Sequence, residues 1–287
     1  MSSQKDRVLR AMLNDGSFRV MTVRATDMVA GIVEAQQASD ETAGVFGELL
    51  CGSVLIRETM SPNNRVQVLL HGGDGAYLVA DAWPEGNTRG LIQIPDGLEQ
   101  FRLGAEPRLQ VSRAMWSGEQ QQGIVAFDPE AGVVGGMMRY FQESEQITTM
   151  VALGCVVRDG KVVTAGGLVV QLLPEVTQAP LAIMTARLED FVKLGPLLEE
   201  HDADPQWLMD EVTYGFESTL LSESEIRFAC PCSRERALAA VASLPTADLD
   251  EAIADQETLK TDCDYCRERY EITPADLAEI RSQQETD

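Results

Sequence analysis

Four cysteines near the C-terminal end of the chain fall into two short pairs, a C-x-C at Cys230 and Cys232 and a C-x-x-C at Cys263 and Cys266. Four cysteine thiolates complete the tetrahedral shell of a Zn²⁺ ion, and each short pair brings two ligands that are already neighbours. Pro231 lies between the first two and fixes its own φ torsion, which helps to hold the extended backbone that a one-residue spacer needs. The spacing therefore predicts one zinc site that these four cysteines build together.

The same four thiols are also suited to a response to oxidants. Metal-bound cysteines are thiolates, and the thiolate is the form that oxidants attack. Each pair can close on its own, which would remove the ligands two at a time and release the ion. Because zinc contributes about 10 kcal/mol or more to small sites of this kind, we expect its loss to unfold the surrounding region. The residues alone leave three interpretations open: a redox-responsive zinc site, a purely structural zinc site, and four unrelated cysteines.

The charge of the chain limits its partners. Its 287 residues include 46 Asp and Glu against 23 Lys and Arg, a formal net charge of −23. Such a chain repels phosphate backbones and anionic lipid surfaces, so we expect neither a nucleic acid nor a membrane as its partner. Residues 1–16 contain no apolar run suited to a signal peptide, and we expect a cytoplasmic location, where thiols stay reduced.

Most of the chain before the cysteines predicts a mixed fold. Residues 17–26 and 65–70 alternate in the manner of strands, and residues 40–60 carry the apolar stripe of a helix. Further strands are expected at residues 76–83, 89–94, 108–115, 122–127, 148–157 and 161–173. The pattern predicts an α+β body over residues 1–178 with a largely antiparallel sheet.

Two further regions are expected to follow this body. Residues 179–228 contain segments with helical periodicity and are predicted to form a helical linker region. Residues 229–287 hold all four paired cysteines and carry fourteen Asp and Glu against six Lys and Arg. A unit this small and this charged needs a disulfide or a bound metal to stay folded, and we expect it to be a zinc-binding domain.

The motifs also resemble those of a known family. The segments "FACPCSRER" (228–236) and "CDYC" (263–266), together with "FGELLCGSVLI" (46–56), "HGGDGAYLVADAW" (71–83) and "YFQESEQITTMVALG" (140–154), occur in the order found in the 33 kDa chaperonin family, the redox-regulated heat-shock holdases. The resemblance covers most of the chain. Its most specific parts are the cysteine pattern and "YFQESEQ".

The resemblance implies a redox cycle. In the reduced state one Zn²⁺ would be held by Cys230, Cys232, Cys263 and Cys266, and the chain would be an inactive monomer. Oxidation would form the disulfides Cys230–Cys232 and Cys263–Cys266, release zinc, unfold the zinc domain and linker, and promote a homodimer. That form would bind unfolding client proteins without ATP and pass them to ATP-dependent foldases. The chain would not be an enzyme, and no catalytic residue is expected.

One position departs from the family pattern. Family members usually have a glycine directly after C-x-x-C, where a turn needs a positive φ angle, and here the residue is Arg267. This departure bears on the local geometry of the turn that carries Cys263 and Cys266.

Two other functions remain as alternatives to the holdase. The first is a thiol–disulfide oxidoreductase that uses the C-x-x-C pair, although a second pair thirty residues upstream and the lack of a thioredoxin-like βαβ frame argue against it. The second is a purely structural zinc scaffold. The remaining cysteines, Cys51 and Cys155, lie within apolar patterns and are expected to be small buried hydrophobes.

Overall fold

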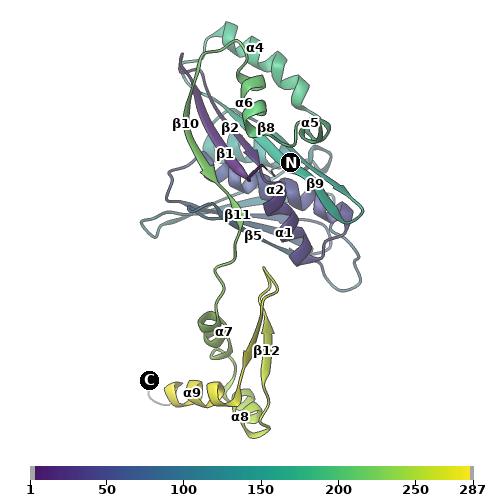
Figure 1. Ribbon diagram of the computed structural model, residues 1–287, viewed down its shortest axis with the longest axis vertical. Helices are drawn as coiled ribbons and strands as arrows, with labels where there is room; N and C mark the ends of the chain where they lie inside the picture. The colour runs from purple at the N-terminus through teal and green to yellow at the C-terminus, as the bar shows by residue number, and fades with distance from the viewer. Residues whose placement is uncertain (1–3, 285–287) are drawn as a thin grey trace. The chain divides into compact units, whose positions relative to one another are not determined.

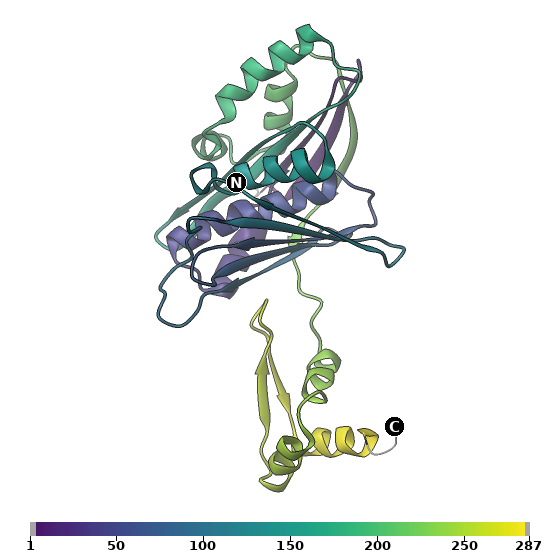
Figure 2. The same ribbon diagram turned by 180° about the vertical axis from the view of Figure 1, so that it is seen from behind.

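The computed structural model describes residues 4–284 of the chain. It divides into two compact units, Met1–Ala229 and Cys230–Asp287. The first unit, here called the body, contains two sheets and most of the helices (Figures 1 and 2). The second unit contains all four paired cysteines.

The first sheet of the body has five strands in the order β10-β1-β2-β9-β8. Every neighbouring pair in it is antiparallel. The strands are Arg7–Leu13 (β1), Phe18–Arg24 (β2), Thr149–Arg158 (β8), Lys161–Leu172 (β9) and Ser218–Glu225 (β10).

The second sheet of the body has six strands in the order β11-β5-β4-β3-β6-β7. They are Arg65–His71 (β3), Tyr77–Ala82 (β4), Asn87–Gln93 (β5), Arg108–Ala114 (β6), Gln120–Ala126 (β7) and Arg227–Phe228 (β11). The short β11 pairs in parallel with β5, and the other pairs are antiparallel. The predicted α+β class with largely antiparallel sheet is therefore confirmed.

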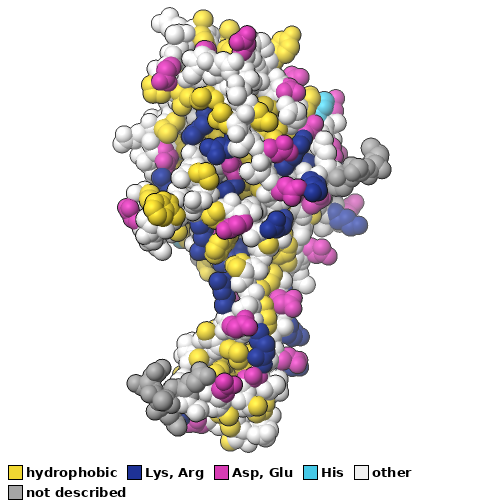
Figure 3. Space-filling model, turned by 60° about the vertical axis from the view of Figure 1, so that its left-hand side comes forward, with side chains coloured by type: hydrophobic (Ala, Val, Ile, Leu, Met, Phe, Trp, Pro, Cys, Tyr) yellow, Lys and Arg dark blue, Asp and Glu magenta, His cyan; other side chains and the backbone are white. Residues whose placement is uncertain are grey.

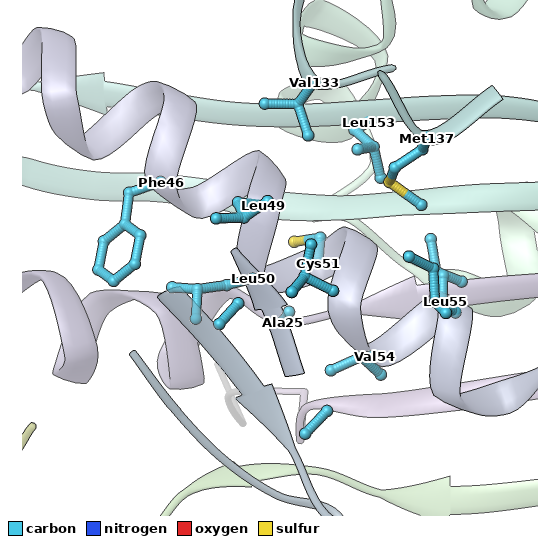
Figure 4. Close-up of a cluster of buried hydrophobic side chains, with 14 of the residues drawn as sticks. Ala25, Phe46, Leu49, Leu50, Cys51, Val54, Leu55, Val133, Met137 and Leu153 are labelled. Carbon is cyan, nitrogen blue, oxygen red and sulfur yellow. The ribbon is translucent and has the colours of Figure 1, made fainter. Parts of the chain in front are cut away.

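Helices fill the space between the two sheets (Figure 1). The helices α1 (Thr26–Gln36) and α2 (Asp40–Glu58) lie there with α3 (Gly132–Tyr140), which continues into a short π-helix at Phe141–Glu145. The Ser39 hydroxyl accepts the backbone N–H of Thr42 at 3.4 Å and so caps α2. One large cluster of buried side chains joins these helices to both sheets. Figure 4 shows part of it around Leu50 and Cys51 of α2.

A second layer of helices covers the other face of the first sheet (Figure 1). It consists of α4 (Gln178–Leu188), α5 (Leu194–Glu200) and α6 (Pro205–Thr213). Leu188 and Leu208 from these helices pack with Phe18 of β2 in a separate buried cluster. The central strands of the first sheet are therefore buried on both faces, which explains why β2 is apolar on both of its sides, with Met21 in one cluster and Phe18 in the other.

The predicted helical linker over residues 179–228 needs a correction. Its first part is helical through Thr213, but residues 218–228 form the strands β10 and β11. Most β10 side chains are exposed, and the strand is held by backbone pairing along β1. Because neither face of β10 is buried, the segment carries no apolar alternation from which a strand could be predicted.

The C-terminal unit is small. It contains α7 (Arg234–Val241), α8 (Thr246–Ala254), a hairpin of β12 (Leu259–Asp262) and β13 (Arg269–Ile272), and α9 (Pro274–Gln284). Its buried core consists of Val241, Leu249, Ala252, Ile272, Leu277 and Ile280. A core of this size supplies little stability by itself, so the unit needs a further constraint.

Among the described residues, none of the helices combines the length and the apolar character that a membrane span requires.

Candidate metal centre

The four predicted ligands meet at one place in the C-terminal unit. The first pair lies in the extended segment just before α7, and the second pair lies in the turn that joins β12 to β13. One ligand atom from each of Cys230, Cys232, Cys263 and Cys266 lies within 4.8 Å of all the others. The structure thus brings together four residues that the spacing predicted as a group.

The sulfur spacing fits a tetrahedral ion. The Sγ atoms of Cys230 and Cys263 are 3.7 Å apart, and those of Cys232 and Cys266 are 3.3 Å apart. Four sulfurs at the usual Zn–S distance of about 2.3 Å from one ion lie about 3.8 Å from each other. Four thiolates this close repel one another strongly unless a cation lies between them. The donor set and its geometry therefore suit a thiophilic divalent ion.

The hairpin turn positions the second pair. The backbone N–H of Cys263 donates to the Glu268 carbonyl at 2.9 Å, and the N–H of Arg267 donates to the Cys263 carbonyl at 2.8 Å. Arg267 has a φ of 60°. A side chain in this left-handed region costs about 1–2 kcal/mol, which glycine would avoid. The turn therefore needs positive φ where the sequence analysis expected it, and the chain forms it with arginine.

Two contacts hold α7 and α9 near the site. The Ser233 hydroxyl accepts the backbone N–H of Arg236 at 3.3 Å and caps α7 directly after Cys232. The Arg234 guanidinium donates to the Asp276 carboxylate at 2.7 Å. The Arg234 contact, followed by bonds from Thr273, lowers the pKa of Asp276 to about 2. The start of α9 is thereby tied to the helix that follows the first cysteine pair.

The environments of the two hairpin sulfurs differ. Burial, and then the nearby sulfurs of Cys232 and Cys263, hold the pKa of Cys266 above its ordinary value. Burial also opposes ionisation of Cys263, but bonds from the backbone N–H groups of Cys266 and Tyr265 outweigh it and lower the pKa of Cys263. The turn therefore makes Cys263 easier to ionise than an ordinary cysteine, whereas burial makes Cys266 harder to ionise.

A further contact was not predicted from the sequence. The hydroxyl of Tyr270 donates to Sγ of Cys232 at 3.1 Å. Tyr270 lies on β13, and no spacing rule links it to the cysteines. Only its position four residues after Cys266 could have drawn attention to it.

The two remaining cysteines have a different environment. Cys51 is fully buried in the core of the body, where Figure 4 shows it among apolar side chains. Burial raises the pKa of Cys51 and raises the pKa of Cys155 to about 12. Both therefore stay protonated at neutral pH. Cys51 is the small buried hydrophobe that the sequence predicted, whereas Cys155 is only partly buried and packs against the same core.

Comparisons with known proteins agree with this architecture. The family model described as "Hsp33 protein" matches residues 6–273. The 33 kDa chaperonin of Syntrophotalea carbinolica is 28% identical over 285 residues, which cover 95% of this chain and 98% of that protein. The 33 kDa chaperonin of Thermus thermophilus is 29% identical over 299 residues, covering 96% of this chain and 87% of that protein.

One solved structure shares the fold. The crystal structure of the 33 kDa chaperonin (heat shock protein 33 homolog) from Thermotoga maritima aligns with a TM-score of 0.84 over 99% of this chain and 100% of that chain, at 20% identity. This likeness concerns the fold, whereas the family model matches nearly the whole sequence. The chain belongs to the Hsp33 family.

Proposed function

We propose that the chain is a redox-regulated, ATP-independent holdase chaperone of the cytoplasm. The observation that carries this proposal is the cluster of four sulfurs within 4.8 Å of one another in a unit whose buried core has six residues. In the reduced state Cys230, Cys232, Cys263 and Cys266 would hold one Zn²⁺. The ion would then supply the constraint that the small core cannot.

Oxidation would release the ion by converting its ligands to disulfides. A thiolate attacks one oxygen of hydrogen peroxide and becomes a sulfenic acid as hydroxide leaves. The second thiolate of the pair attacks that sulfur, forms the disulfide and expels a second hydroxide. Each disulfide thus reduces one peroxide, and the pairs Cys230–Cys232 and Cys263–Cys266 would consume two. A disulfide sulfur is a poor ligand, so zinc leaves.

The strands β10 and β11 are suited to transmit this loss to the body. Ala229, directly before Cys230, donates its backbone N–H to the Thr88 carbonyl at 3.1 Å. Phe228 packs so closely on α1 that a methyl group added at Gly31 would lie 3.0 Å from its ring. Unfolding of the C-terminal unit would remove the anchor that follows this short segment, and we expect β11 and β10 to detach.

Detachment would uncover surface that suits unfolding proteins. It would expose the apolar groups of α1 beneath Phe228 and leave the edge of β1 without a partner. Unfolded chains bind to both kinds of surface, through apolar contacts and through added strands. Leu220 and Leu221 of β10 are already exposed apolar side chains. Figure 3 shows further hydrophobic side chains on the face of the body that is turned toward the viewer. The active form would be a homodimer that later passes its clients to ATP-dependent foldases.

An oxidoreductase remains the second candidate for the C-x-x-C pair. In this structure Cys263 and Cys266 lie in a hairpin turn, with the other two cysteines beside them. A dithiol enzyme of the thioredoxin type places its C-x-x-C near a βαβ unit, so the surroundings favour a metal site instead. Catalytic turnover of a dithiol substrate by the oxidised protein would restore this candidate.

The test compares zinc, thiols and chaperone activity in one sample. The reduced, zinc-loaded protein is treated with hydrogen peroxide, and released zinc, remaining thiols and the aggregation of a heat-unfolded client are measured. We expect one zinc released, four thiols lost and aggregation suppressed at near-stoichiometric ratios. The variant Cys51→Ala is the control and should respond in the same way. Zinc release without any gain in suppression would refute the proposal.

A further inference from the structure

Tyr270 joins the two halves of the cysteine cluster. It lies on β13, opposite Thr261 of β12, and its hydroxyl is 3.1 Å from Sγ of Cys232. A phenol carries a proton at neutral pH and a metal-bound thiolate carries none, so the hydroxyl donates and the sulfur accepts. The bond therefore connects the C-x-C pair to the hairpin that bears the C-x-x-C pair.

A hollow of about 250 Å³ opens beside this bond. Its lining includes Cys232, Cys263, Tyr270 and Thr261, whereas the described lining residues do not include Cys230 or Cys266. A small electrophile that enters the hollow therefore meets Cys232 and Cys263, and of these two Cys232 accepts the hydrogen bond from Tyr270.

We propose that Tyr270 is a positioning residue that restrains the reactivity of Cys232 and helps this sulfur to hold the metal. A donated hydrogen bond draws electron density from the sulfur and lowers its nucleophilicity. It also fixes the orientation of the ligand, as outer-shell partners of metal ligands do. This inference rests on the proposed zinc site and adds to it a control on which sulfur reacts.

The main experiment measures each cysteine separately. The reduced, zinc-loaded full chain is treated with iodoacetamide, from which a thiolate displaces iodide to form a thioether, and peptides are quantified by mass spectrometry. Tyr270→Phe should raise the rate at Cys232 about tenfold and weaken zinc binding about tenfold in a chelator competition. Thr261→Val, which removes another hydroxyl from the same hollow, should change neither.

A spectroscopic measurement separates the hydrogen bond from a loss of packing. In protein loaded with Co²⁺, a sulfur without its hydrogen bond donates more charge, so Tyr270→Phe should move the sulfur-to-cobalt charge-transfer band to lower energy. Replacement of Tyr270 by 3-fluorotyrosine keeps the size and strengthens the donor. It should move the band the other way and slow the reaction of Cys232.

The results that would overturn the inference differ from those that would overturn the chaperone proposal. Equal acceleration of all four cysteines in Tyr270→Phe, or an unchanged band in both variants, removes the role of Tyr270 even if peroxide still activates the protein. A changed rate at Cys232 in a protein that peroxide does not activate supports the role of Tyr270 and removes the chaperone proposal.

Discussion

The cysteines of the body and those of the C-terminal unit lie in opposite kinds of environment. In the body, Cys51 and Cys155 are held among apolar groups by a core that spans two sheets and three helices, and burial keeps their thiols protonated. In the described part of the C-terminal unit, four sulfurs meet beside a core of six buried residues, and the turn lowers the pKa of Cys263. Cys51 and Cys155 need no metal, whereas the four clustered cysteines are proposed to be the main constraint on their unit.

This contrast explains how one chain can unfold in part. The stability of the body comes from buried apolar area, which oxidants do not change. In the proposed reduced state, the stability of the C-terminal unit would depend on bonds between zinc and sulfur that oxidants break. A chain built in this way can lose one unit and keep the other.

The largest expected effect follows from removal of two ligands. In the double variant Cys263→Ser with Cys266→Ser, zinc binding should lose most of its contribution to folding, on the order of 10 kcal/mol. Hydrogen exchange should then show the loss of protection in β13 and α9, with α2 unchanged. Tight zinc binding by this double variant would contradict the ligand assignment.

A cavity in the core of the body should lower the stability of the body and leave the zinc site unchanged, which is the reverse of the effect of the double ligand variant. Leu50 is fully buried, and Leu50→Ala should lower the free energy of unfolding of the body by about 3 kcal/mol. All three tryptophans, Trp83, Trp116 and Trp207, lie in the body, so denaturation followed by tryptophan fluorescence reports on it alone. Zinc affinity should not change. A weaker zinc site in this variant would show that the two units do not keep separate sources of stability.

The body should also respond to pH through the partly buried carboxyl of Glu48. Burial raises the pKa of Glu48 to about 7. The unfolded chain ionises near pH 4.5, so the folded state holds the proton longer, and stability is lost as the pH rises from about 4.5 to 7. Glu48→Gln should therefore stabilise the body by about 1 to 3 kcal/mol at pH 8 and have no effect near pH 4. Equal effects at both pH values would remove this explanation.

The smallest expected effect lies in the turn of the metal site. Arg267→Gly should relieve about 1 kcal/mol of backbone strain and tighten zinc binding about fivefold, as a chelator competition would measure. Gln37, with a φ of 52° after α1, offers the matched control in the body. Gln37→Gly relieves similar strain and should leave zinc affinity as it was. Weaker zinc binding in Arg267→Gly would show that the arginine side chain contributes more than its backbone costs.

Sequence patterns predicted the body well because its elements bury apolar faces. The strand at residues 17–26 and the helix at 40–60 appear as β2 and α2 with ends shifted by a few residues. The strand β10 escaped prediction because it buries neither face and depends on the backbone of β1. Tertiary pairing of this kind leaves no periodic signal in the strand itself.

The candidate site was likewise predicted only in part from the sequence. Short spacing within each cysteine pair predicted that four sulfurs would gather, since local pairs need only one long-range contact to meet. The bond from Tyr270 to Cys232 could not be predicted, because it depends on the twist and register of the hairpin. The cysteine cluster could be predicted because the spacing of the residues indicates it. The bond from Tyr270 could not, because only the geometry of the hairpin creates it.

Hydrogen exchange before and after oxidation tests the difference between the two units most directly. The same sample is measured when reduced and zinc-loaded, and again after peroxide has removed the zinc. We expect α8, β13 and α9 to lose their protection while α2 keeps its own. Protection of α9 that persists after the zinc has left and the four thiols have been oxidised would contradict the proposal that the metal holds this unit folded.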